Sequence, residues 1–159
     1  MDHRPLNPRI CNITLDANAL DLDGSAGDGL VARFRELMGD RKLNIVISGG
    51  VRREVQHPNT PAHVQADMLP QIFNLRPGLN SSQQNARRHV AAILQGNAQP
   101  GKHTEDASHL SEAAETGCGY FVTHDRRILA KRADLGRILP PSLTIATLAE
   151  FFAILDGQA

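Results

Sequence analysis

The hydrophobic positions of this chain alternate between two kinds of spacing. Short, β-rich apolar runs predict strands at Ile10–Leu15, Leu43–Ile47, Tyr120–Thr123 and Leu143–Ile145. Apolar residues elsewhere recur with the spacing of an α-helix, which predicts helices over Leu30–Met38, Val51–Val55, Ala62–Phe73, Ser81–Leu94, Thr104–Thr116, Asp125–Ala133 and Thr147–Leu155. Strands separated by helices favour an α/β fold with a mainly parallel sheet and helices on both faces.

Composition narrows the class of protein. A chain of 159 residues with 41% hydrophobic residues is expected to form a single domain, residues 1–159, with residues 1–9 as an extension before the first strand. Seventeen basic and seventeen acidic residues cancel, so any binding of nucleic acid must use a local patch. The lack of a membrane-length or signal-like apolar run predicts a cytoplasmic protein, and the widely separated Cys11 and Cys118 are expected to be reduced thiols.

Acidic residues follow the predicted strands or begin the predicted helices. Asp16 comes directly after the first strand, and Asp125 closely follows the third. Glu54 lies in the helix that leaves the second strand, and Asp106 in the first turn of a helix for which Thr104 is the expected N-cap. Sites in parallel α/β folds form outside the carboxyl ends of the strands, so these carboxylates are expected to lie on one side of the sheet.

Carboxylates crowded together repel one another, and a hard divalent cation removes that conflict. Such an ion can polarise a phosphodiester and lower the pKa of a bound water. Each acid also has a purely structural interpretation: Asp106 as a helix-start acid, Asp125 as an N-cap, and Asp16 and Glu54 as surface groups. The metal hypothesis rests on the coincidence of all four.

Four segments together resemble the acidic motifs of the PIN domain family. They are ITLDANAL, ISGGVRREV, EDASHLSEAA and GYFVTHDRRIL, in the order of that family. The resemblance implies a Rossmann-like α/β/α sandwich and a Mg²⁺- or Mn²⁺-dependent nuclease acting on RNA. Because many members are toxins of toxin–antitoxin pairs, it also raises an antitoxin protein as a partner and a homodimer as an assembly.

The resemblance assigns roles residue by residue. Asp16, Glu54, Asp106 and Asp125 would be the metal-site acids and catalytic residues, and Thr123 would orient a carboxylate or a bound water. Asn18 would hydrogen-bond the neighbouring acids, and it is also a candidate substrate-binding residue.

Basic residues follow the ends of the second and third strands. Arg52, Arg53, Arg126 and Arg127 are candidates for holding the phosphates that flank the scissile bond, and a solvated helix face is their alternative interpretation. His109, three residues after Asp106, is expected to be a helix-surface histidine, with a metal ligand as the alternative.

The leading hypothesis is therefore a divalent-metal-dependent endoribonuclease. A catalytically inactive domain of the same fold, binding RNA or a protein partner, is the second hypothesis. A phosphotransfer or phosphatase domain with Asp16 as nucleophile is a third, against which Asn18 counts because such domains usually carry an aspartate there.

Overall fold

The computed structural model describes residues 5–22, 24–25, 27–46, 58, 61–63, 80–98 and 103–158. The predicted helix Val51–Val55 and most of the predicted helix Ala62–Phe73 lie outside these residues. The same is true of the site candidates Glu54, Arg52 and Arg53.

A four-stranded, all-parallel sheet forms the centre of the molecule. Its strands are β1 (Asn12–Leu15), β2 (Asn44–Ile45), β3 (Tyr120–Val122) and β4 (Thr144–Ala146), in the spatial order β2-β1-β3-β4. β1 lies between β2 and β3, and Leu15 is opposite Val122 in the register of the latter pair. The predicted parallel sheet is confirmed. β1, β2 and β3 lie inside their predicted ranges, and β4 begins and ends one residue later than predicted.

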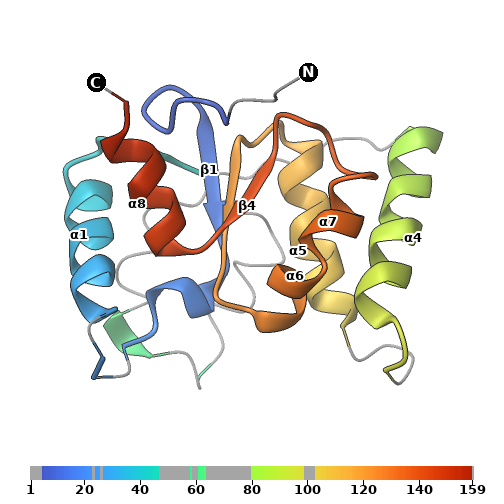
Figure 1. Cartoon of the computed structure of the whole chain (residues 1–159), viewed down its shortest axis with the longest axis horizontal. Helices are drawn as coiled ribbons and strands as arrows, with labels where there is room; N and C mark the ends of the chain where they lie inside the picture. Colours follow the sequence, from blue (N-terminus) through green and yellow to red (C-terminus); the bar gives the residue numbers. More distant parts are fainter. Residues whose placement is uncertain are drawn as a thin grey trace.

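One face of the sheet is covered by α1 (Asp28–Gly39) and α8 (Leu148–Asp156) (Figure 1). Their contact is aromatic. The ring of Phe151 packs edge-to-face on Phe34, with centroids 5.6 Å apart, and on Tyr120 of β3 at 5.4 Å. These rings belong to a buried cluster that also takes in the inward-facing residues of β1, such as Ile13 and Leu15. Aromatic burial therefore fixes this helical layer to the sheet.

Of the described helices, α5 (Thr104–Glu115), α6 (Arg126–Ala130) and α7 (Arg132–Leu135) lie on the opposite side, and α4 (Ser81–Gln95) packs outside them against α5 and α7 (Figure 1). Val90 and Leu94 of α4, Leu110 of α5 and Ile128 of α6 form a second buried cluster with Phe121 of β3. Because side chains alternate along a strand, Tyr120 and Val122 of β3 lie in the first cluster and Phe121 lies in the second. The fold is an α/β/α sandwich of Rossmann-like type, as the sequence predicts.

Helix ends differ in detail from the predictions. Asn80, the residue before the predicted start of α4, caps this helix through a reciprocal capping box with Gln83. His103, rather than Thr104, occupies the N-cap position of α5 and makes no side-chain capping bond. After α5, Gly117 has a φ of +72°, a left-handed conformation that glycine adopts without a Cβ clash.

No helix within the described ranges is both long and apolar enough to cross a membrane.

Candidate carboxylate site at the strand ends

Asp16 is buried at the carboxyl end of β1. Its side chain follows Leu15 directly, only 2% of the residue is exposed, and its backbone N–H donates to the carbonyl of Val122 over 2.9 Å. Asp16 also begins a short 3₁₀ helix, Ala17–Leu20, which turns the chain away from the sheet. The alternative interpretation of Asp16 as a surface group is therefore wrong.

Thr123 connects the ends of the two central strands. Its hydroxyl donates to Oδ2 of Asp16 over 3.0 Å, and the same oxygen accepts the backbone N–H of Asp125, also over 3.0 Å. The side chain is fully buried. Because β1 and β3 are parallel neighbours, the residues after Leu15 and Val122 emerge side by side, which places Thr123 against Asp16.

Asn18 joins the same group of strand-end residues. Its Oδ1 accepts the backbone N–H of His124 over 3.2 Å and lies 3.5 Å from the hydroxyl of Thr123. The amide therefore fixes the chain that follows β3 to the 3₁₀ turn that follows β1. A contact between Asn18 and a substrate stays a prediction.

Asp125 is the N-cap of α6, as one interpretation of the sequence proposed. Its Oδ1 accepts the backbone N–H groups of Arg127 and Ile128 over 2.9 and 3.1 Å. Both bonds end at Oδ1, so within the described residues Oδ2 carries no capping bond. The capping role and a site role are thus compatible in one carboxylate.

Asp106 is brought to this group by α5. Burial raises the pKa of its carboxyl above the ordinary value, and the negative charges of Asp125 and Asp16 raise it further. A contact with His103 and the charge of His109 act in the opposite direction. Asp106 therefore lies within electrostatic reach of both Asp16 and Asp125, which come from two other elements.

His109 is not the surface histidine that the sequence suggested. Only 3% of it is exposed, and its Nδ1 lies 3.5 Å from Oδ1 of Asp16. The available signal was its position on α5 beside Leu110 and four residues before Ala113, which are both buried. A polar residue within an apolar helical face contacts a buried partner more often than solvent.

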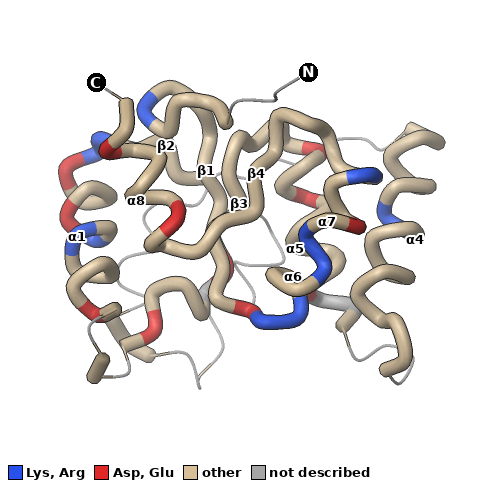
Figure 2. Tube along the Cα trace, in the orientation of Figure 1, with Lys and Arg blue, Asp and Glu red and all other residues tan. Residues whose placement is uncertain are grey.

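Arg126 and Arg127, at the start of α6, follow Asp125 directly in the sequence (Figure 2). Arg126 is exposed. Arg127 instead turns its guanidinium to the backbone carbonyls of Leu94 and Gln95, the last turn of α4, where a cation complements the helix dipole. The two neighbouring arginines thus differ, and phosphate binding by either stays a prediction.

The donor types of this site suit a hard divalent cation. Within the described ranges, no group of three or more His, Cys, Asp or Glu side chains is arranged to hold a metal ion. Mg²⁺ keeps several waters and is commonly bound through one or two carboxylates, so it does not require three side-chain ligands. Asp16, Asp106 and Asp125 supply oxygens of the right kind, and a cation would relieve their mutual repulsion.

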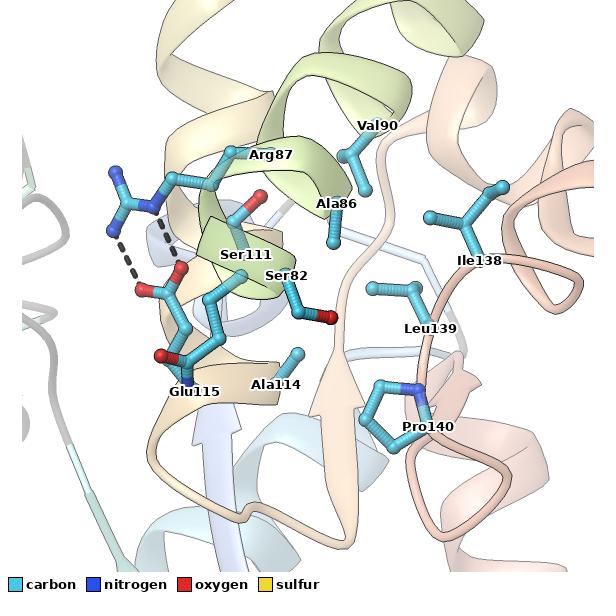
Figure 3. Close-up of a pocket in the computed structure, with 11 residues that line it drawn as sticks. Ser82, Ala86, Arg87, Val90, Ser111, Ala114, Glu115, Ile138, Leu139 and Pro140 are labelled. Carbon is cyan, nitrogen blue, oxygen red and sulfur yellow. Dashed lines mark hydrogen bonds and ion pairs between the residues drawn. The ribbon is translucent and has the colours of Figure 1, made fainter. Parts of the chain in front are cut away.

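A pocket of about 200 Å³ lies elsewhere, between α4, α5 and the segment before β4 (Figure 3). Its walls include Val90, Ile138 and Leu139, and the ion pair between Arg87 and Glu115 borders it. Of the described site carboxylates, Asp16, Asp106 and Asp125, none lines it. The pocket and the carboxylate site are therefore separate features, and the chemistry of the acids argues for the strand ends.

No protein family, curated protein or solved structure matches this chain. The function must accordingly be argued from the site itself.

Proposed function

We propose that this protein is a divalent-metal-dependent endoribonuclease that uses Mg²⁺ or Mn²⁺. The observation that carries the proposal is the convergence of Asp16, Asp106 and Asp125, from three elements, at the carboxyl ends of parallel strands. The pKa of Asp106 is raised first by burial and then by the negative charges of Asp125 and Asp16, so gathering these acids costs free energy. A fold that maintains such a cost gains a cation site from it.

In this proposal Asp16, Asp106 and Asp125 surround the cation, with one or two of them as direct ligands and the rest acting through bound water. Glu54, which lies outside the described residues, belongs to the same set. When bound, the ion polarises a phosphodiester and activates water. Thr123 holds Asp16 in one orientation by its hydroxyl. Asp125 uses Oδ1 to cap α6, which leaves Oδ2 for the cation.

Charge bears on how a polyanionic substrate would be held. The chain has no net charge, so a polyanion must be held locally, and Arg126 is the exposed cation adjacent to Asp125. Arg52 and Arg53 are further candidates, outside the described residues. RNA as substrate, an antitoxin partner and a homodimer rest on the PIN-like resemblance, and a cytoplasmic location rests on the hydropathy of the sequence. All four belong to the same proposal.

A second candidate function is a non-catalytic domain of the same fold that binds RNA or a protein. Two observations favour it. No group of three or more potential metal ligands is formed by the residues that the structure describes. In addition, Asp125 and Arg127 both have contacts that stabilise helix ends, so their presence is explained without a reaction.

The two functions are separated by incubating the purified protein with a panel of structured RNAs in EDTA, Mg²⁺ or Mn²⁺. The control is a variant in which Asp16, Glu54, Asp106 and Asp125 are all replaced by their amides. Metal-dependent cleavage by the wild type alone is the expected result. RNA binding that is retained without cleavage by either protein would favour the non-catalytic domain.

A further inference from the structure

We propose that His109 is a positioning residue for Asp16, an inference that rests on the proposed nuclease function. The histidine enters the site from α5, whereas Asp16 enters from β1, and both side chains are buried. Nδ1 of His109 lies 3.5 Å from Oδ1 of Asp16. This distance exceeds that of a good hydrogen bond, so the pair is an electrostatic contact.

The contact divides the two oxygens of Asp16 between two partners. Oδ2 accepts the hydroxyl of Thr123, and Oδ1 faces His109. The χ2 torsion of an aspartate is soft, so a contact on one oxygen alone leaves the carboxylate free to rotate. Contacts on both sides restrict that rotation and present the carboxylate in one orientation.

The place of His109 on α5 makes this role specific. Asp106 and His109 are three residues apart on one helix, and side chains at that spacing lie on one face. α5 therefore delivers a carboxylate and a positively polarised ring edge to Asp16 together. The charge of His109 also opposes the effect of Asp16 on the pKa of Asp106.

The test uses two substitutions that differ in where they place a nitrogen. The side-chain amide of His109→Asn puts a nitrogen near the position of Nδ1, whereas His109→Gln puts it near Nε2. His89→Gln, on the exposed face of α4, is the matched control. The rate of Mn²⁺-dependent cleavage of a structured RNA is measured at saturating Mn²⁺, and its dependence on Mn²⁺ concentration is followed.

We expect His109→Gln to lower the rate or the Mn²⁺ affinity by about 10–100-fold, and His109→Asn to stay within about threefold of wild type. His89→Gln should leave both unchanged. Equal loss in the Asn and Gln variants, or no loss in either, would overturn the positioning role.

A wild-type protein that cleaves no RNA would overturn the proposed function instead. The inference on His109 is then decided by urea unfolding of Asp16→Asn, His109→Gln and the double variant. Midpoint shifts that are clearly non-additive support the pairing, and additive shifts contradict it.

Discussion

Thr123 donates its hydroxyl to Oδ2 of Asp16 over 3.0 Å, joining residues that are 107 positions apart in the chain. The bond spans the carboxyl ends of the two central strands, and the same hydroxyl oxygen accepts the N–H of Asp125. One buried hydroxyl therefore links two of the three described acids of the site.

Thr123→Val should lower both stability and cleavage. Valine keeps the shape but leaves a buried carboxylate oxygen and a backbone N–H without their partner, which costs about 1–3 kcal/mol. Thr123→Ser retains the hydroxyl and is the control, with stability and cleavage close to wild type. Urea unfolding and RNA cleavage check the prediction, and a valine variant as stable and active as the serine variant would contradict it.

Asp106→Asn should change how stability depends on pH in metal-free buffer. The folded-state pKa of Asp106 is raised, so the native state binds this proton more tightly than the unfolded state does. Wild-type stability therefore falls as pH rises from the unfolded to the folded pKa of this carboxyl. The Asn variant lacks that fall and should exceed wild type in stability at neutral pH, while the two converge in acid.

Glu150→Gln is a control, because the stability contributed by Glu150 should depend on pH in the opposite direction. Burial raises the pKa of Glu150, but its bonds to Arg132 and to the backbone of Thr147 outweigh this and lower it. The stability from these bonds is present above the unfolded pKa and is lost as pH falls through the folded one. Thermal unfolding across mildly acidic pH compares both variants, and curves parallel to wild type would refute both assignments.

How far the site could be anticipated depends on the range of the interactions. Strand ends follow from local apolar runs, so the proximity of Asp16 and Thr123 was predictable once a parallel sheet was expected. The direction of the Arg127 side chain was not predictable, because it is set by a hydrogen bond to the end of α4, a segment distant in sequence. The burial of His109 depends on how α5 docks, which its sequence spacing shows only weakly.

Gly119→Ala should destabilise the start of β3. A Cβ built at Gly119 would lie 2.7 Å from Sγ and 3.0 Å from Cβ of Cys11, both closer than normal packing allows. Such overpacking costs about 1–3 kcal/mol. Cys11→Ala in the same chain should relieve only part of the loss, since its Cβ remains.

The control for this glycine is Gly39→Ala, at the last residue of α1, where a Cβ meets nothing within 4 Å. It should be neutral or slightly stabilising. Chemical denaturation of the three variants checks the set, and equal effects at Gly119 and Gly39 would rule out the steric explanation.

Two ion pairs of similar geometry should contribute differently to the free energy of unfolding, because one of them is more buried. Arg87 contacts Glu115 through two bonds of 2.6 Å, and the Glu115 side chain is only 4% exposed. Arg132 contacts Glu150 at 2.8 Å, with both side chains at least 40% exposed. Arg87→Met strands a buried carboxylate and should cost about 2 kcal/mol, whereas Arg132→Met should cost less than about 1 kcal/mol. The reverse order in urea unfolding would contradict this account.

The central claim is that the strand-end carboxylates hold a catalytic cation, and single-turnover RNA cleavage by Asp16→Asn and Asp125→Asn tests it most directly. Asparagine caps a helix nearly as well as aspartate, so Asp125→Asn removes charge while keeping the cap of α6. Both variants should remain folded, with stability equal to or above wild type, and cleave at least about a hundredfold more slowly at saturating Mn²⁺. Full activity in either folded variant, with metal supplied, would contradict the account.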